Sequence, residues 1–289
     1  MSIAYLNNEF LPLEDARISP MDRGFLFADG VYEVVPFFHG HGFTLEGHIQ
    51  RLQRSLKEIH LEVDWKVEDW QKMIEELAHR NGGGNQSIYL QVTRGIAMAR
   101  SHNFPDSVTP TIFAMSTPVD SPLAEDVTQA KGIKAVTLPD IRWKRCDIKS
   151  ISLLPNILMK QQAKELGAKE AILIRDGQIT ECAAANVFIV KDGVIKTTGK
   201  SEHILGGITR DLVIHLAHSN ALNCQECALA LDDLLGADEI WVCSATQEVV
   251  PVITLDGKAV GDGQVGPYWK QMAQLYQQYK QRTYGCYDE

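Results

Sequence analysis

The stretch that decides the fold runs from residue 141 to residue 190. It opens with Ile141-Arg-Trp-Lys-Arg-Cys-Asp-Ile-Lys149-Ser and, after a helix-like segment, closes with Thr180-Glu181-Cys-Ala-Ala-Ala-Asn-Val-Phe-Ile-Val. Lys149 stands just before an apolar run, and Glu181 lies at the end of a short strand-like run. We therefore expect an amine and a carboxylate on neighbouring elements of one compact unit.

A lysine amine is protonated near neutral pH, and it reacts with an aldehyde only when it is partly desolvated or lies beside other cations. Arg142, Lys144 and Arg145 provide such cations in the sequence. Taken alone, Lys149 is most simply a surface lysine and Glu181 a surface acid, because both residue types are mostly exposed. The residues around them decide between these interpretations.

The two blocks Arg145-Cys-Asp-Ile-Lys-Ser150 and Thr180-Glu-x-x-x-x-Asn-Val-Phe188 resemble the class IV, or fold type IV, pyridoxal-phosphate aminotransferases. The match is nearest to the D-amino acid aminotransferases. It implies a two-domain α+β fold, with an N-terminal α/β sandwich-like domain and a C-terminal β-barrel-like domain with helices. It also implies that Lys149 holds pyridoxal 5'-phosphate covalently and moves the substrate proton, while Glu181 pairs with the protonated pyridine nitrogen.

Length and composition agree with two domains. The 289 residues are 45% hydrophobic, which is enough to bury a large core. A polar, proline-bearing stretch favours a boundary, so we expect an N-terminal domain over 1–118, a linker over 119–126 and a C-terminal cofactor-binding domain over 127–289. Strands followed by isolated helices indicate α+β rather than a doubly wound sheet.

The net charge of -9 without a block of like charge argues against nucleic acid or an anionic membrane as a partner. The first residues lack the pattern of a signal peptide, and no apolar run approaches the roughly 20 residues that span a bilayer. We expect a cytoplasmic protein whose six cysteines are free thiols. Cys224-Gln-Glu-Cys227 has the spacing of a metal site but no second pair at finger distance, so no metal is expected.

Near the N-terminus, Asp29-Gly-Val-Tyr32-Glu opens a valine-rich run. In this run Val31, Glu33 and Val35 share one strand face, and Tyr32 lies on the other. From this pattern alone, a strand aromatic packed in the core is as good an interpretation of Tyr32 as a residue of a binding site. The block again resembles the D-amino acid aminotransferases, in which the matching tyrosine lines the substrate pocket.

The segment after residue 46 predicts a helix, and its periodicity places Arg51 on the solvated side. However, His48-Ile-x-Arg51-Leu matches the family segment whose arginine binds the cofactor phosphate. A guanidinium fork suits a phosphate dianion. The expected apolar face of this helix consists of Ile49, Leu52, Leu56 and Ile59.

A loop that reads Arg94-Gly-(x)4-Arg100-x-His102-x-Phe-Pro has the polarity of an ordinary surface loop. It is also the most discriminating match to the D-amino acid aminotransferases. There the residues matching Arg100 and His102 bind the substrate α-carboxylate from the partner subunit. The resemblance thus implies a homodimer with shared active sites.

The cofactor phosphate has its own expected residues. Ile204-Leu-Gly-Gly-Ile-Thr209 reads as a glycine-led helix start, which can bind an anion, or as a simple turn. The family match assigns the phosphate to Ile208, Thr209, Ser244 and Thr246, and assigns Arg142 to the phenolic oxygen of the cofactor. Two departures reduce the hydroxyl groups common in the family, namely Ala183–Ala185 and Ala245.

The resemblance implies amino transfer between D-amino acids, such as D-alanine and D-glutamate, and 2-oxo acids, such as 2-oxoglutarate and pyruvate. A branched-chain L-amino acid aminotransferase and an aminodeoxychorismate lyase are the alternatives, because they share the lysine and the glutamate. Tyr32, Arg100 and His102 favour the D-enzyme. A cofactor-free binding or scaffold protein that keeps the fold is the alternative outside enzymes.

Overall fold

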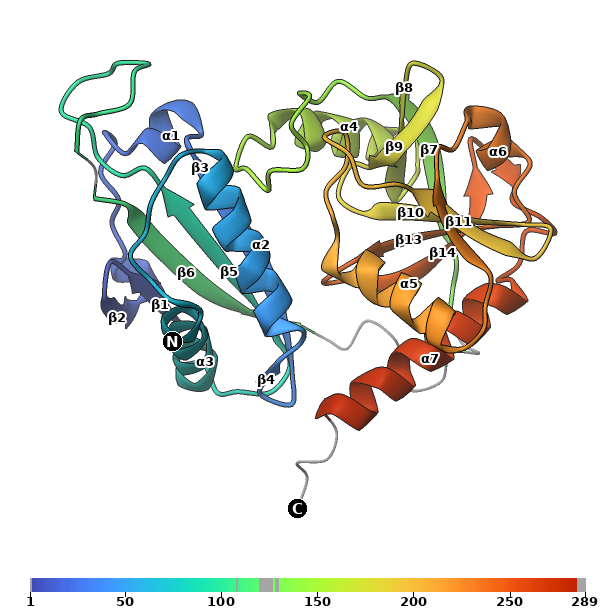
Figure 1. Cartoon of the computed structure of the whole chain (residues 1–289), viewed down its shortest axis with the longest axis horizontal. Helices are drawn as coiled ribbons and strands as arrows, with labels where there is room; N and C mark the ends of the chain where they lie inside the picture. The colour runs from blue at the N-terminus through green and yellow to red at the C-terminus, as the bar shows by residue number, and fades with distance from the viewer. Residues whose placement is uncertain (1, 108, 120–126, 128–129, 285–289) are drawn as a thin grey trace. The chain divides into compact units, whose positions relative to one another are not determined.

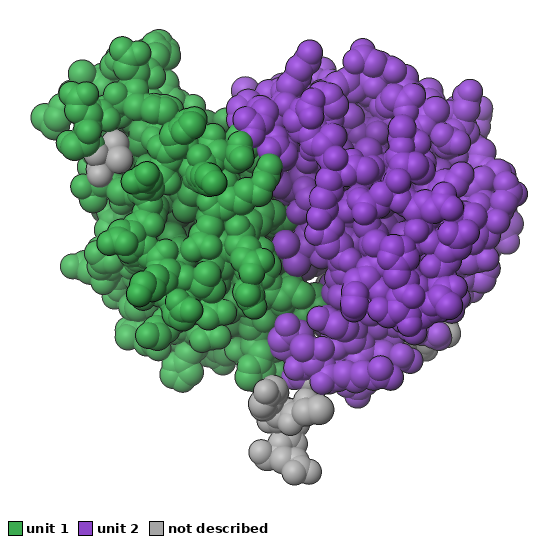
Figure 2. All heavy atoms as spheres, viewed as in Figure 1, with its two compact units in different colours: residues 1–121, 148–152 green, residues 122–147, 153–289 purple. Residues whose placement is uncertain are grey.

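The chain folds into two units, each built around one sheet (Figures 1 and 2). The first unit comprises Met1–Ser121 and Ile148–Ser152, and the second comprises Pro122–Asp147 and Leu153–Glu289. This computed structural model describes residues 2–107, 109–119, 127 and 130–284. Of the predicted linker 119–126, all but Val119 lies outside the described residues.

The first unit contains a six-stranded antiparallel sheet with the order β2-β1-β6-β5-β3-β4. Asn7 and Asn8 form the turn between the first two strands, with φ of 46° and 75°. Both asparagines tolerate this left-handed conformation better than most residues. The strands are β1 (Ile3–Leu6), β2 (Glu9–Pro12), β3 (Gly30–Phe38), β4 (His41–Gly42), β5 (Gln86–Thr93) and β6 (Thr111–Pro118).

Helices α2 (Leu45–Glu58) and α3 (Val67–Arg80) pack against this sheet (Figure 1). The predicted apolar face of α2 is buried, except that Ile59 lies beyond the helix end and is only partly buried. Burying each such side chain contributes about 1.5–3 kcal/mol. The short elements η1 (Leu13–Asp15) and α1 (Arg23–Phe27) precede β3.

The segment 148–152 joins the first unit, although the chain before and after it belongs to the second. Ile148 is part of the first unit's core, and the Ile151 N–H donates to the Gly30 carbonyl oxygen at 3.1 Å. A Cβ at Gly30 would lie 2.6 Å from the Val92 carbonyl oxygen and 3.1 Å from Ile151 Cδ1, so glycine permits the close approach of both β5 and the 148–152 segment. The expectation that Lys149 shares one unit with Glu181 is therefore wrong, because apolar packing and backbone hydrogen bonds hold this segment on β3.

The second unit contains a nine-stranded mixed sheet in which the path β12-β11-β10-β13-β14-β7-β8-β9 is extended by β15 on β14. The sheet curls, so that strands near its two ends meet. The Thr198 hydroxyl on β11 donates to the Ile179 carbonyl oxygen on β9 at 3.3 Å. This agrees with the barrel-like expectation. The strands are β7 (Ile133–Pro139), β8 (Glu170–Arg175), β9 (Gln178–Cys182), β10 (Asn186–Lys191), β11 (Val194–Thr198), β12 (Cys224–Cys227), β13 (Glu239–Ser244), β14 (Glu248–Leu255) and β15 (Lys258–Ala259).

The helices in the described part of this unit are α4 (Leu154–Glu165), α5 (Ile208–Ser219), α6 (Leu231–Leu235) and α7 (Pro267–Tyr284). Helix α4 buries Met159 and Ala163 against the sheet, whereas four aliphatic residues on it or at its end are exposed: Leu154, Ile157, Leu158 and Leu166. Helix α5 packs on β13 and α7. None of the helices in the described part of the chain is long and apolar enough to cross a membrane.

Candidate active site

Lys149 is held beside Tyr32 within the first unit. The Tyr32 N–H donates to the Lys149 carbonyl oxygen at 2.9 Å, and the Lys149 N–H donates to Ser55 Oγ at 3.3 Å. The Lys149 Nζ lies 4.1 Å from the centroid of the Tyr32 ring, within cation–π range. The structure thus brings together two residues that the sequence predicted separately.

A buried ionic triad of Glu33, His48 and Arg51 lies in the same unit. Arg51 donates from Nε to Glu33 Oε1 at 2.7 Å and from Nη2 to Glu33 Oε2 at 2.8 Å, while His48 Nδ1 lies 2.8 Å from Oε2. The Arg51 side chain is only 10% exposed, so it is not the solvated residue that helical periodicity predicted. The two parallel hydrogen bonds fix the plane of its guanidinium group.

The charges of this triad are coupled. Burial opposes ionisation of Glu33, but Arg51 and His48 outweigh burial and hold the pKa of Glu33 far below its usual value. Burial lowers the pKa of His48 although Glu33 opposes the shift, and the charges of Arg51 and Lys149 lower the pKa further. His48 is thus assigned as neutral at pH 7, donating from Nδ1 to the carboxylate, and the charge of Lys149 lies close enough to be felt there.

Glu33 and His48 were not predicted as site residues, although the sequence contains a signal for the first. Glu33 alternates with Val31 and Val35 on β3, and all three are buried. An ionised carboxylate on a buried strand face requires a charged partner. The pattern could therefore have predicted an ion pair, but not which basic residue supplies it.

Replacing Glu33 with glutamine should lower the free energy of unfolding by about 3–5 kcal/mol at pH 7.5, because it leaves Arg51 without its buried counter-charge. Since the folded-state pKa of Glu33 is depressed, its stabilising contribution is fully present above the unfolded value of about 4.3 and declines progressively as pH falls from there toward the much lower folded-state pKa. Urea unfolding at pH 7.5 and pH 3.5 measures both values.

Glu46→Gln is the matched control. Glu46 is exposed at the start of α2, the helix that carries His48 and Arg51, and it accepts a hydrogen bond from Gln50. It should change stability by less than about 0.5 kcal/mol. A Glu33→Gln deficit of equal size at both pH values would contradict this account of the triad.

In the second unit, Glu181 is buried and surrounded by donors. Arg142 Nη1 donates to Oε1, Asn186 Nδ2 donates to Oε2 at 3.0 Å, and the Leu205 N–H reaches both oxygens at 3.1 Å. Burial raises the pKa of Glu181 to about 7, although Arg142 opposes the shift. A further cation beside this carboxyl group would lower its pKa again. The arrangement suits a carboxylate that pairs with a protonated ring nitrogen.

Arg142 is itself occupied by acidic partners. It donates from Nε to Asp140 at 2.9 Å as well as to Glu181, and Arg145 pairs with Asp147 at 3.0 Å. The expectation that Arg142 and Arg145 act as unneutralised cations beside Lys149 is therefore wrong. The neighbouring carboxylates neutralise them.

Of the five residues expected at the phosphate, all but Arg51 lie in the second unit. Ile208 and Thr209 form the first turn of α5, whose N-cap residue Gly207 has no side chain to cap the first N–H groups. Ser244 ends β13, and its buried Oγ has no hydrogen-bond partner among the described residues. Thr246 follows in the turn between β13 and β14. An unsatisfied buried hydroxyl costs about 1–3 kcal/mol, so these residues fit an anionic ligand group that would accept its hydrogen bond.

Asn186 links the Glu181 site to this helix start. Besides Glu181, its Nδ2 donates to the Leu205 carbonyl oxygen at 2.9 Å. A Cβ at Gly207 would lie 2.0 Å from Asn186 Oδ1, so only glycine allows this approach. Nothing in the sequence indicated this connecting role of Asn186.

Arg100 and His102 lie on an exposed loop of the first unit. The Arg100 guanidinium is 4.8 Å from the Phe27 ring centroid, and the His102 ring is 5.3 Å from it. Arg23 Nη1 donates to the Ser101 carbonyl oxygen at 2.7 Å. The loop is therefore anchored on α1, and both predicted carboxylate-binding side chains are presented to solvent.

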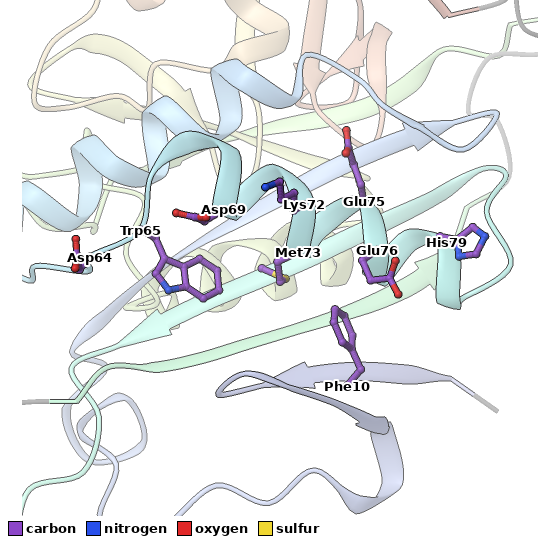
Figure 3. Close-up of a pocket in the computed structure, with 9 residues that line it drawn as sticks. All are labelled: Phe10, Asp64, Trp65, Asp69, Lys72, Met73, Glu75, Glu76 and His79. Carbon is purple, nitrogen blue, oxygen red and sulfur yellow. The ribbon is translucent and has the colours of Figure 1, made fainter.

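A separate hollow of about 890 Å³ lies on the first unit, beside α3 (Figure 3). It is rich in carboxylates, and none of the predicted site residues lines it. Within the described residues, no three His, Cys, Asp or Glu side chains are grouped to hold a metal ion. The lining residues are Phe10, Asp64, Trp65, Asp69, Lys72, Met73, Glu75, Glu76 and His79.

Solved structures share this fold over nearly the whole chain. The branched-chain amino acid aminotransferase from Escherichia coli has a TM-score of 0.86 at 26% identity, covering 95% of this chain and 92% of that one. The branched-chain amino acid aminotransferase from T.th., in complex with N-(5'-phosphopyridoxyl)-L-glutamate, has a TM-score of 0.85 at 25% identity, covering 96% and 92%. The fold is thus that of the fold type IV aminotransferases, as the sequence predicted.

The family model for class IV aminotransferases matches residues 30–255. A D-alanine aminotransferase from Bacillus licheniformis is 42% identical over 264 residues, which cover 91% of this chain and 92% of that protein. One from Listeria monocytogenes is 40% identical over 272 residues, covering 94% and 93%. The chain therefore belongs to the class IV aminotransferase family, and as a member it is an enzyme acting on small molecules. This confirms the resemblance seen in the sequence.

Proposed function

We propose that this protein transfers amino groups between D-amino acids and 2-oxo acids, with pyridoxal 5'-phosphate as its cofactor. The observation that carries the proposal is the Lys149 amine, which lies over the Tyr32 ring on a backbone fixed to β3. The D-alanine aminotransferases at about 40% identity support the D-substrates.

When bound, the cofactor would supply the electron sink that accepts charge from the substrate Cα. Lys149 would hold the cofactor covalently and move the Cα proton, first as base and then as acid. Glu181 would pair with the ring nitrogen and keep its proton in place. Ser244, Thr246 and the first N–H groups of α5, including that of Thr209, would bind the phosphate.

Two arginines receive different roles in this proposal. Arg51, held by Glu33, would contribute its positive charge at the phosphate. Arg142 donates to Glu181, to Asp140 and to the His203 carbonyl oxygen. We therefore propose that Arg142 orients Glu181, in place of the expected contact with the phenolic oxygen.

The substrate carboxylate would be bound by Arg100 and His102 from the other subunit of a homodimer. Both side chains are exposed in a single chain, on a loop that α1 holds in place, so a second chain can receive them. We also propose a cytoplasmic location, since the five cysteines that the structure describes are free thiols, as is usual in reducing compartments.

Mixing inactive Lys149→Ala subunits with inactive Arg100→Ala subunits should restore part of the activity. A mixed dimer would contain one site with both residues intact, if the loop serves the neighbouring chain. Subunit exchange is monitored by native mass spectrometry. Proven exchange without recovered activity would show that Arg100 serves its own chain.

D-alanine and D-glutamate should be substrates with 2-oxoglutarate or pyruvate as acceptor, whereas L-leucine should be poor. Because Arg100 and His102 would fix the carboxylate on one side of the cofactor, we expect kcat/KM to favour D-alanine by about a hundredfold or more, or roughly 2.7 kcal/mol. A coupled assay of the 2-oxo acid product measures both donors.

The second candidate function is branched-chain L-amino acid transamination. It is favoured by the solved structures that share the fold, which are branched-chain aminotransferases. In the same assay, turnover of L-leucine with none of D-alanine would establish this candidate and exclude the D-enzyme.

A further inference from the structure

The turn that carries Ser244 and Thr246 ends at a residue with an unusual environment. Glu248 begins β14, is fully buried and has a φ of 55°, a left-handed conformation that is uncommon for a residue with a side chain. Ser244 and Glu248 are directly paired between β13 and β14, so they close the turn from opposite sides. The position of Glu248 therefore affects where the Ser244 hydroxyl lies.

Helix α7 holds the Glu248 side chain. Lys280 Nζ donates to Oε1 and Gln277 Nε2 donates to Oε2 at 2.7 Å. Lys280 is itself 9% exposed. Each Glu248 oxygen thus has a donor from the last two turns of this helix.

The same helix packs on α5. Its Tyr276, one turn before Lys280, is fully buried. Burial raises the pKa of Tyr276 well above its usual value, so the phenol remains protonated. Figure 1 shows α5 and α7 packed together in this unit. One face of α7 therefore contacts both chain segments that carry the expected phosphate ligands.

A buried ion pair is often no more stabilising than apolar residues of the same size, so fold stability alone is a weak reason for Lys280 and Glu248. A left-handed residue with a side chain adds a further cost. Such costs are typical of positions where geometry at a functional site is fixed by its surroundings. The unsatisfied Ser244 Oγ lies at the other end of the same turn.

We propose that α7 is a positioning element for the cofactor phosphate, an inference that rests on the proposed function. Lys280 and Gln277 fix Glu248 and hence the turn that presents Ser244 and Thr246. The packing of α7 on α5 supports the helix that begins with Ile208 and Thr209. Together these contacts keep hydroxyl groups from two distant chain segments at the spacing that one phosphate requires.

The test compares two ligands, pyridoxal 5'-phosphate and pyridoxal, which lacks the phosphate. Equilibrium dialysis against cofactor-free protein gives the Kd of each. In Lys280→Met, the Kd of pyridoxal 5'-phosphate should rise about tenfold or more, while that of pyridoxal should change by less than about twofold. Lys270→Met is the matched control, since Lys270 is exposed on the same helix, and it should change neither value.

An equal loss of affinity for both ligands would mean that α7 only stabilises the fold, and unchanged affinities would overturn the proposal outright. If circular dichroism shows that Lys280→Met is unfolded, Gln277→Leu takes its place, because it removes one hydrogen-bond donor to Glu248. In that variant an unchanged preference for the phosphorylated ligand overturns the proposal. Wild-type protein that binds both ligands equally would instead disprove the cofactor assignment, and the role of α7 with it.

Discussion

Lys149→Ala should lose transamination almost completely, by about 10⁴-fold or more in kcat, while the protein stays folded. A positioned general base and acid alone contributes about 10²–10⁴-fold, and this lysine would also hold the cofactor. The substitution removes a half-buried amine whose ring contact is with Tyr32, so the core around Ile148 is unaffected. Steady-state rates with D-alanine, together with thermal unfolding, measure both parts of this expectation.

Lys164→Met provides the control for loss of a lysine charge. Lys164 is exposed near the end of α4 on the second unit and has no role in the proposed reaction. Its activity should stay within about threefold of wild type. Activity above about one hundredth of the wild-type rate in Lys149→Ala would remove Lys149 from the mechanism.

Glu181→Gln should reduce kcat by roughly ten- to a hundredfold or more. Glutamine keeps the size of the side chain but removes the charge, and a charge-assisted hydrogen bond is worth about 1.5–3 kcal/mol. The ring nitrogen would then lose its proton more readily, and the cofactor would accept charge from the substrate less well. Rapid-mixing measurement of the proton-transfer step with D-alanine isolates this effect from substrate binding.

Thr180→Val serves as the neighbouring control, because Thr180 donates to Asp140 rather than to Glu181. It should reduce kcat by less than Glu181→Gln does.

Since burial raises the pKa of Glu181 to about 7, the cofactor-free wild-type protein should also take up a proton between pH 8 and 6 that Glu181→Gln does not. Wild-type proton-transfer rates in Glu181→Gln would show that this carboxylate has no part in the reaction.

Local patterns in the sequence predicted most elements of the fold. Helix α2 buries the apolar face that its periodicity predicts, and Val31, Glu33 and Val35 share a buried face of β3 as their alternation predicts. The mistakes concern tertiary relations. Nothing local shows that residues 148–152 leave the second unit to pack on β3, because backbone hydrogen bonds between distant segments decide that.

The candidate site shows the same limit. Periodicity describes the burial of a helix face, but it treats Arg51 as solvated because it cannot see Glu33 on a neighbouring strand. Likewise, the run of basic residues after 141 carries no sign that Asp140 and Glu181 neutralise Arg142. The family resemblance predicted which residues would contact a cofactor. It did not predict the residues that position them, such as Asn186, because those contacts join segments that are distant in the sequence.

The central claim is that Lys149 holds pyridoxal 5'-phosphate, and chemical labelling tests it most directly. The protein is loaded with the cofactor, reduced with borohydride, digested and mapped by mass spectrometry. The account predicts one pyridoxyl group per chain, on the peptide that contains Lys149. A label on the exposed Lys144, on Lys160 or on no lysine at all would contradict it.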